Sequence, residues 1–341
     1  MKKLLNTLFV TTPDAYLHKE GETVAVDKDK KTVLRLPIHT LSGIVTFGNV
    51  MTSPHLLGLC AERGVCVSFM SEHGKFLARV EGGVSGNVLL RLAQTRAYEN
   101  AGKKGDLARS FVIGKVLNAR TVLMRRLRDH GDDAHLASAV ETLAGTLRLL
   151  RDSPPDAARI RGLEGEAAAI YFGVFNKLVV SQEEAFTIES RNRRPPLDPM
   201  NALLSFLYTL LTHDCRGALE GVGLDPQIGF LHELRPGRPS LALDLMEEFR
   251  AALADRVALS LVNLRQVTAR DFKRTESGAV TMKDDARKTV LAAWQKKKQE
   301  QIVHPFLEEK VPVGLLPHLQ ALLLARHLRG DLDAYPPFIL K

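Results

Sequence analysis

Apolar and polar residues alternate through the first part of the chain, as they do in strands with one buried face. The runs with this pattern are also rich in β-branched and aromatic side chains. They span residues 5–11, 23–26, 32–37, 42–47 and 65–70. Between the last two runs, residues 55–63 favour a short helix. We therefore expect a small β-sheet domain at the beginning of the chain.

The pattern changes after a glycine-rich segment, EGGVSGN, at residues 81–87. Glycine leaves the backbone free and contributes no side chain to a core, so this segment is expected to be a linker. We place an N-terminal β domain at residues 1–80 and a larger helical domain at residues 88–341. The expected fold class is α+β with two domains.

Helix-forming residues with helical spacing dominate the second domain. One helix or two are expected over residues 89–128, with an interruption around residues 102–105. Further helices are expected over residues 133–151, 162–178, 201–219, 241–254 and 256–263 and from about residue 284, with a hairpin at 274–282.

One stretch of this domain interrupts its apolar pattern with acids and a histidine. Residues 228–250 read IGFLHELRPGRPSLALDLMEEFR. Ser240 is expected to cap a helix that carries Asp244 and Glu247 on one face, because residues three apart are neighbours on a helix. His232 lies just upstream, across a turn. A carboxylate in apolar surroundings needs a cation, a hydrogen-bond donor or a proton, so this stretch outlines a metal site.

A metal ion usually takes three or more protein ligands, which directs attention to another acid in an apolar helix. Residues 162–178 read GLEGEAAAIYFGVFNKL. An apolar stripe with helical spacing runs through this segment, and Glu164 begins the neighbouring face. Glu164 is therefore expected to point inward.

Each of these residues also has a purely structural interpretation. His232 could be a hydrogen-bonded loop histidine, and Asp244 could pair with Arg250 or Arg238. Glu247 could face solvent, and Glu164 could be a first-turn acid that the helix dipole favours. The residues alone leave these alternatives open.

Charge favours a polyanionic partner without identifying one. The chain has 47 Lys and Arg residues against 39 Asp and Glu residues, which gives a net charge of +8. Residues 91–130 contain ten basic and three acidic side chains, a local balance of +7. DNA would bind such a stretch through its phosphates, whereas the alternative is a helix face that only contacts solvent.

Other features limit the location and the cofactors. The three cysteines, at positions 60, 66 and 215, lack the CxxC spacing of zinc sites and favour a reducing compartment. No signal peptide or apolar run of about 20 residues is present, so we expect a cytoplasmic protein without a membrane partner. The absence of a Walker P-loop and of GxGxxG argues against a nucleotide cofactor.

Four segments, taken in order, resemble the CRISPR-associated integrase family Cas1, the universal spacer-acquisition protein. They are GLEG with a later YF, DPMNALLSFLYTLL at residues 198–211, GFLHELRPGRPSLALDLMEEFR at residues 229–250, and LLARHLRGDLDAYPPF at residues 323–338. The last segment most resembles subtype I-C. The resemblance covers nearly the whole chain.

The resemblance implies a set of site residues. Glu164, His232 and Glu247 correspond to metal ligands, and Asp244 to a nearby catalytic acid. Some family members have aspartate at the position of Glu247. Two carboxylates with one imidazole favour Mn²⁺, with Mg²⁺ as a substitute. Three further residues match family motifs and have either a supporting role near DNA or a hydrogen-bonding role in the core: Tyr171, Asn201 and Tyr208.

The resemblance also implies a reaction in antiviral defence. Such a site joins the 3′ hydroxyl of a captured DNA fragment to the edge of a CRISPR repeat by transesterification. With water as the nucleophile, the same site is an endonuclease, a hydrolase of phosphodiester bonds. The alternative is a noncatalytic DNA-binding scaffold whose buried acids are structural.

Finally, the resemblance implies partners. They are double-stranded DNA from the fragment and the repeat, and a second copy of the chain paired through the N-terminal domains. Two such homodimers would flank a Cas2 dimer in a hetero-hexamer. Subtype I-C implies a Cas4 nuclease as a further partner.

Overall fold

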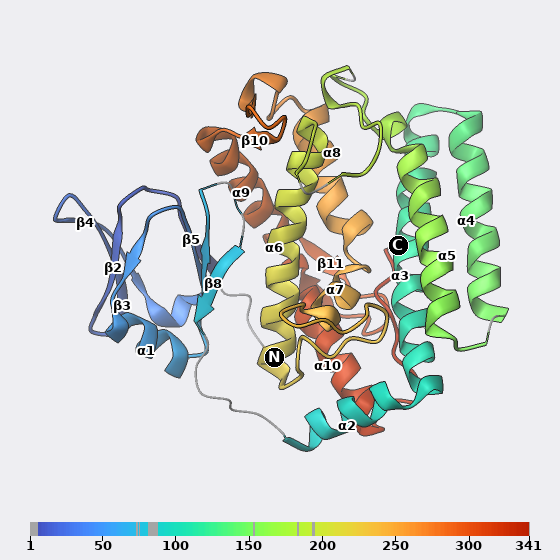
Figure 1. Cartoon of the computed structure of the whole chain (residues 1–341), viewed down its shortest axis with the longest axis horizontal. Helices are drawn as coiled ribbons and strands as arrows, with labels where there is room; N and C mark the ends of the chain where they lie inside the picture. The colour runs from blue at the N-terminus through green and yellow to red at the C-terminus, as the bar shows by residue number, and fades with distance from the viewer. Residues whose placement is uncertain are drawn as a thin grey trace. The chain divides into compact units, whose positions relative to one another are not determined.

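The computed structural model describes residues 6–340 except for 73, 75, 81–87, 153, 183, 193 and 194. The expected linker at residues 81–87 therefore lies outside the described residues. The chain forms two compact units, which Figure 1 colours by position in the sequence. The first is Met1–Gly86 with Met282–Glu300, and the second is Asn87–Thr281 with Gln301–Lys341.

The first unit contains two four-stranded sheets. One sheet has the order β1 (Asn6–Val10), β5 (Leu41–Phe47), β7 (Cys66–Met70) and β8 (Phe76–Val80). Strands β1, β5 and β7 are parallel, and β8 pairs antiparallel with β7. The other sheet has the order β4 (Lys31–Pro37), β3 (Thr23–Lys28), β2 (Tyr16–Glu20) and β6 (Met51–Thr52). Strands β4, β3 and β2 pair antiparallel, and β6 is parallel to β2.

All five expected strands are present, but the sequence pattern did not predict β2, β6 and β8. The reason is their burial. Strand β2 buries only Leu17 among its described side chains, and β8 buries none completely, so neither shows a clear apolar face in the sequence. Strand β6 is only two residues long.

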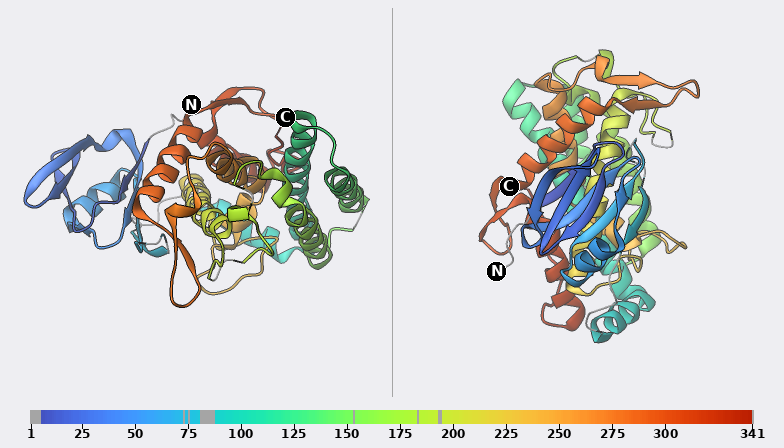
Figure 2. Two further views of the ribbon diagram at one scale, coloured as in Figure 1. Left: turned by 90° about the horizontal axis from the view of Figure 1, so that it is seen from above. Right: turned by 90° about the vertical axis from the view of Figure 1, so that its left-hand side faces the viewer.

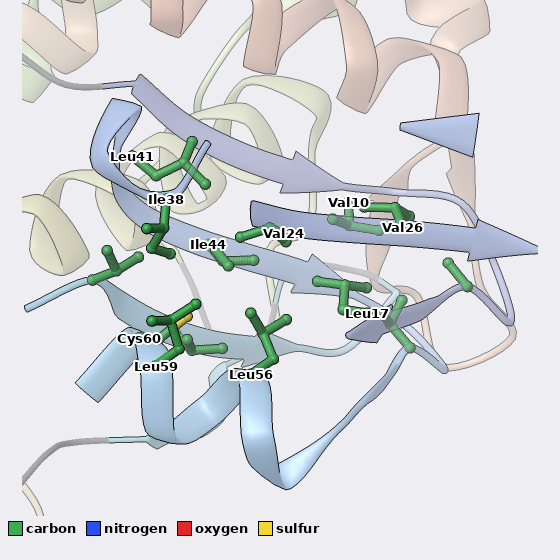
Figure 3. Close-up of a cluster of buried hydrophobic side chains, with 14 residues drawn as sticks. Val10, Leu17, Val24, Val26, Ile38, Leu41, Ile44, Leu56, Leu59 and Cys60 are labelled. Carbon is green, nitrogen blue, oxygen red and sulfur yellow. The ribbon is translucent and has the colours of Figure 1, made fainter. Parts of the chain in front are cut away.

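A cluster of aliphatic side chains forms the core of the first unit (Figure 3). Leu17 and Val24 come from the second sheet, Ile44 comes from the first, and Leu56 comes from α1 (Pro54–Glu62). Each has 0% exposure, and burying such a side chain contributes about 1.5–3 kcal/mol. Helix α1 begins where Ser53 Oγ accepts a hydrogen bond from the backbone N–H of Leu56, at 3.2 Å.

Helix α9 (Asp284–Gln299) belongs to the first unit. Gln295 Nε2 donates a hydrogen bond to the backbone oxygen of Thr7, at 3.0 Å, and the Trp294 side chain is 1% exposed. The sequence placed residues 282–300 in the helical domain. In the structure, the second unit is therefore assembled from two separate segments.

The second unit is mostly helical. Figures 1 and 2 show α3, α4 and α5 lying side by side. The helices of this unit are α2 (Val88–Glu99), α3 (Ala101–His130), α4 (Ala134–Asp152), α5 (Ala157–Gly173), α6 (Pro199–Val222), α7 (Ser240–Met246), α8 (Arg256–Asn263) and α10 (Leu316–Arg329). The expected hairpin is present as β9 (Phe272–Arg274) paired with β10 (Val280–Met282), and β11 (Gln301–Val303) pairs antiparallel with β12 (Lys310–Pro312).

The break in the long helical segment lies at Asn100, not at the expected residues 102–105. Asn100 caps α3, because its side-chain oxygen accepts a hydrogen bond from the backbone N–H of Lys103, at 3.0 Å. Gly105 lies inside α3, where a Cβ atom would be 1.8 Å from the backbone oxygen of Pro155. This glycine permits a close approach of two backbones and does not end the helix.

The expected α+β fold class with two domains is confirmed. The helix expected over residues 241–254 differs from the structure, since α7 ends at Met246 and a π-helical turn follows at Arg250–Asp255. Within the described part of the chain, no helix combines the length and the apolar character needed to cross a membrane.

Candidate metal centre

Asp244 organises the loop before α7. Its side chain is completely buried, and its carboxylate accepts hydrogen bonds from the backbone N–H groups of Phe230, Leu231 and His232, at 2.5, 3.0 and 2.9 Å. Asp244 Oδ1 also lies 2.7 Å from His232 Nδ1. If the carboxylate accepts this bond, Nδ1 carries a proton, and in the neutral imidazole the lone pair then lies on Nε2. Asp244 thus prepares His232 to act as a ligand through Nε2.

A close approach of two backbone segments makes this arrangement possible. At Gly229, a Cβ atom would lie 2.6 Å from the carbonyl carbon of Ser240 and 2.8 Å from Asp244 Oδ2. Ser240 is the first residue of α7, and Pro239 occupies the N-cap position. Ser240 Oγ instead donates to the backbone oxygen of Glu233, at 3.0 Å. The expectation that Ser240 caps the helix is therefore wrong.

The other predicted ligands meet around a lysine. Glu247 directly follows α7, and its side chain is 2% exposed. Lys115 Nζ, from α3, lies 2.8 Å from Glu247 Oε2 and also forms an ion pair with Glu164, from α5. His232 Nε2 lies 3.8 Å from Glu247 Oε1, and the Arg250 guanidinium lies 3.0 Å from that same oxygen. The structure thus brings together all three residues that the sequence predicted as ligands.

Glu247 is ionised at neutral pH. Burial alone would raise its pKa, but the charges of Arg250 and Lys115 outweigh burial and lower the pKa to about 2. Glu247 Oε2 lies 2.8 Å from the Lys115 ammonium. A buried, charged carboxylate that already contacts one cation at this distance is suited to bind another in its place.

Lys115 determines whether these residues can hold a metal. No three His, Cys, Asp or Glu side chains in the described ranges are grouped closely enough to hold a metal ion as they stand. The Lys115 ammonium contacts both Glu164 and Glu247, the two carboxylates that would help to hold a bound cation. Two carboxylates and one imidazole match the preferences of Mn²⁺. The residues therefore fit a divalent ion that replaces the ammonium.

Tyr171 and Tyr208 have a buried partner that the sequence analysis missed. The hydroxyl of Tyr208 donates to Asp255 at 2.7 Å, and that of Tyr171 donates at 3.1 Å. Burial raises the pKa of Asp255 to about 6, although both hydroxyls act to lower it. The guanidinium groups of Arg191 and Arg250 also lie over the Tyr208 ring, at 5.2 and 4.9 Å from its centroid. These contacts connect Asp255 to Arg250 and so to the candidate site.

Asn201 makes local hydrogen bonds near the start of α6. It is completely buried, and its amide nitrogen donates to Asp198 at 2.6 Å and to the backbone oxygen of Ser190 at 2.9 Å. Its side-chain oxygen accepts a hydrogen bond from Arg191 at 2.5 Å. In the structure, Asn201 therefore holds the preceding loop against α6.

Glu248, next to the predicted ligand Glu247, binds the C-terminal segment. Its carboxylate accepts hydrogen bonds from the Tyr335 hydroxyl at 2.6 Å, the backbone N–H of Phe338 at 2.7 Å and Gln320 Nε2 at 2.9 Å. Burial nevertheless raises the pKa of Glu248 to about 8. The turn that carries Glu247 is thus attached to residues almost ninety positions later in the chain.

Lys115, Arg250 and Asp255 are the main site residues that sequence reasoning missed. Lys115 was counted only within the basic stretch, and Arg250 only as a partner for Asp244. A signal was present at Lys115, since its neighbours in FVIGKVLNA are nearly all apolar or small. All three line a pocket of about 20 Å³, room for about one water molecule, with Tyr171 and Phe172 among the other lining residues.

The basic stretch at residues 91–130 does not form one uniform cationic face. Arg120 and Arg126 donate to the backbone oxygens of Val140 and Lys177, at 3.2 and 2.9 Å, and Lys115 lies in the candidate site. These three basic side chains are occupied by contacts within the protein. Any phosphate contacts would come from exposed members of the stretch such as Arg96 and Lys103.

Comparison with known proteins gives consistent matches along the chain. The family model described as CRISPR associated protein Cas1 matches residues 8–296. CRISPR-associated endonuclease Cas1 1 of Chlorobaculum tepidum is 56% identical over 342 residues, which cover 99% of this chain and 99% of that protein. CRISPR-associated endonuclease Cas1 2 of Rhodospirillum rubrum is 55% identical over 347 residues, which cover 100% of both.

Solved structures match as well. A CAS1 protein from Thermotoga maritima gives a TM-score of 0.83 at 24% identity and covers 95% of this chain and 97% of its own. A casposase bound to an integration product gives 0.82 at 23% identity and covers 97% and 93%. Other solved structures that match are a Cas6-RT-Cas1–Cas2 complex and a Cas1–DNA complex. Among the sequence relatives is a Cas4/Cas1 fusion protein of Geobacter sulfurreducens.

Proposed function

Because the chain belongs to the CRISPR-associated Cas1 family, we propose that it is a metal-dependent DNA endonuclease and integrase of CRISPR adaptation. Its relatives are named endonucleases, and a casposase bound to an integration product shares its fold. One observation carries the proposal. Glu247 contacts both the Lys115 ammonium, at 2.8 Å, and His232 Nε2, at 3.8 Å, and the same ammonium pairs with Glu164, so three parts of the chain contribute to one site.

Different neighbouring groups position each of the three candidate ligands. Asp244 keeps the proton on His232 Nδ1, so that Nε2 can bind a metal. Glu247 stays ionised, and Arg250 neutralises its second oxygen. Glu164, whose side chain is 25% exposed, forms the side of the site nearest to solvent. Mn²⁺, or Mg²⁺ in its place, would supply a Lewis acid that polarises a phosphodiester and binds the nucleophile.

The proposed reaction exchanges one phosphodiester for another. The 3′ hydroxyl of a captured fragment attacks a phosphorus atom at the edge of a CRISPR repeat and forms a new P–O bond. The bond from that phosphorus to the 3′ oxygen of the repeat strand breaks, and this oxygen takes up a proton while the attacking hydroxyl loses its own. No nucleotide cofactor is needed because bond energy is conserved. With water as the nucleophile, the same displacement is endonuclease hydrolysis.

The proposed partners follow from the family. We propose that the chain forms a homodimer through its N-terminal β domain, binds double-stranded DNA and assembles with a Cas2 dimer as a hetero-hexamer in the cytoplasm. Cas1–Cas2 and Cas1–DNA structures among the matches support this. We further propose a Cas4 nuclease as a partner and subtype I-C as the assignment. A Cas4/Cas1 fusion and the LLARHLRGDLDAYPPF tail support these two proposals.

Strand transfer tests the function directly. A DNA duplex with 3′ hydroxyls is mixed with a plasmid that carries the repeat, the Cas2 partner and Mn²⁺. We expect joined product from the parent protein, and at least a hundredfold loss from Glu164→Ala, from His232→Ala and from chelation, since the ligands act as a unit. Glu166→Ala, on an exposed position of the same helix, is the control and should retain activity. Full integration by a folded, DNA-binding Glu164→Ala variant would refute the proposal.

A noncatalytic DNA-binding scaffold is the second candidate. Its support is that Lys115 and Arg250 already neutralise the buried acids, as they would in a structural ion-pair cluster. A scaffold should bind DNA equally well with and without divalent ions. Replacement of Glu247 would then destabilise the fold without affecting a catalytic rate. A lower melting temperature of Glu247→Gln would show this.

A further inference from the structure

We infer that Lys115 is a built-in counter-ion, whose ammonium holds Glu164 and Glu247 in place in the metal-free protein and must leave when a divalent ion binds. This inference rests on the metal site proposed above. It adds Lys115 to that site. It also describes the metal-free state, in which the Lys115 ammonium occupies the position of the metal before catalysis.

The position of Lys115 supports this role. It lies in the middle of α3, and its side chain is 13% exposed. The ammonium contacts Glu164 from α5 on one side and Glu247, after α7, at 2.8 Å on the other. Within the described part of the chain, Lys115 is the ion-pair partner of Glu164, whereas Glu247 also has Arg250. The lysine is therefore the cation that the two carboxylates share.

Electrostatics explain why a cation is required there. Two carboxylates brought close together in a largely buried site repel each other, and a buried charge without a partner is strongly destabilising. Lys115 relieves this repulsion without a metal. A divalent ion that bridged the same oxygens would repel the ammonium at close range, so both cations cannot occupy this position.

The structure also offers a place for the displaced ammonium. The pocket beside the site, with room for about one water molecule, is lined by Lys115 itself and by the Asp255 carboxylate. An ammonium group is about as large as a water molecule, and the lysine stem that carries it is long and flexible. Rotation about the side-chain bonds could therefore move the ammonium away from the carboxylates while α3 stays in place.

Displacement lowers the observed metal affinity, because the contacts of Lys115 must be broken before the ion binds. Mn²⁺ binding to the full chain, measured by isothermal titration calorimetry and confirmed by the electron paramagnetic resonance of free Mn²⁺, tests this. We expect Lys115→Met to bind Mn²⁺ about tenfold more tightly than the parent. Without metal, its melting temperature should be lower than that of the parent, and Mn²⁺ should raise it by more.

Three controls identify the cause. Lys177→Met removes an ion pair outside the site, with Asp133 at 3.4 Å, and should leave Mn²⁺ affinity unchanged. Arg250→Gln removes a cation that contacts Glu247 but does not pair with Glu164, and it should give a smaller gain than Lys115→Met. If Lys115→Met does not fold without metal, Lys115→Gln keeps a polar group there and should show the same tighter binding.

The outcomes are distinguishable. Unchanged or weaker Mn²⁺ binding by the Lys115 variants would overturn the inference, as would an equal gain in Arg250→Gln. The proposed metal site is tested separately, by Glu164→Gln. If the parent and Glu164→Gln bind Mn²⁺ alike, the metal site itself is wrong and the proposed function fails with it.

Discussion

Single residues prepare the candidate site by constraining their neighbours. Asp244 binds three backbone N–H groups and the ring of His232, so a surface loop presents its imidazole in one orientation. The alternative in which Asp244 only pairs with an arginine is therefore wrong. Glu247 does not face solvent either, since its side chain is 2% exposed. The hydrogen bonds of Asp244 and the burial of Glu247 exclude two alternatives that the sequence left open.

Gly229 gives a prediction at this scale. In Gly229→Ala, the new Cβ would meet the backbone of Ser240 and the Asp244 carboxylate, so we expect a loss of about 1–3 kcal/mol in the free energy of unfolding. Urea denaturation measures it. Gly217→Ala is the matched control, because its Cβ would meet nothing within 4 Å inside α6, and it should be neutral or slightly stabilising. Equal stability of the two variants would contradict this account.

Asp255 gives a prediction of pH dependence. Burial raises its pKa to about 6 from an ordinary value near 3.8, so the folded state favours the protonated acid. The resulting stabilisation is complete below about pH 4 and is lost as the pH rises through 6, by on the order of 3 kcal/mol.

Asp255→Asn should remove this contribution from the free energy of unfolding measured between pH 4 and 7, whereas the contribution of Glu248, whose pKa is also raised by burial, should remain. Asp285→Asn, at an exposed position on α9, should retain the pH dependence of the parent. An unchanged slope in Asp255→Asn would exclude Asp255 as its source.

At the scale of elements, the π-helical turn after α7 is the least expected feature. It carries Arg250 at one end and Asp255 at the other. The Arg250 guanidinium contacts Glu247, and the Asp255 carboxylate accepts hydrogen bonds from two tyrosine hydroxyls. π-helical turns insert an extra residue per turn and are frequent at functional sites. Six residues are too few for periodicity to distinguish this turn from an α-helix.

The C-terminal segment gives a prediction about an element. Asn118, on α3, donates to the backbone oxygens of Glu248 and Phe338, at 2.7 and 2.9 Å, and accepts from the N–H of Leu340 at 2.7 Å. Asn118→Ala should release this segment and cost about 1–3 kcal/mol. Hydrogen exchange should become faster at residues 335–340, while Thr142→Ala, exposed on α4, should leave it unchanged. Unaltered protection in Asn118→Ala would show that Asn118 does not hold the segment.

At the scale of the whole molecule, the net charge of +8 predicts salt-sensitive DNA binding. The logarithm of the association constant should fall linearly with the logarithm of salt concentration, because phosphate contacts release counterions. If exposed Arg96 and Lys103 contact phosphates, replacing both with glutamine should reduce the slope by about two. Fluorescence anisotropy over a salt series measures this. An unchanged slope would favour the alternative of a helix face that only contacts solvent.

The sequence by itself determined the β part, the helical part and most element positions, because strand and helix periodicities are local properties. It also singled out Glu164, His232, Asp244 and Glu247 as candidate site residues, because acids and a histidine within apolar sequence are chemically conspicuous. Its resemblance to the Cas1 family pointed to the metal chemistry. None of these conclusions required knowledge of which segments meet.

Only the tertiary structure decided the contacts between distant segments. It paired Lys115 with Glu164, 49 positions away, and Tyr335 with Glu248, 87 positions away. It also placed α9 in the first unit. Such contacts depend on how helices pack and on which charged side chains become buried side by side. No local sequence pattern encodes either. The charge of Lys115 is visible in the sequence, but its position between two buried carboxylates exists only in the folded chain.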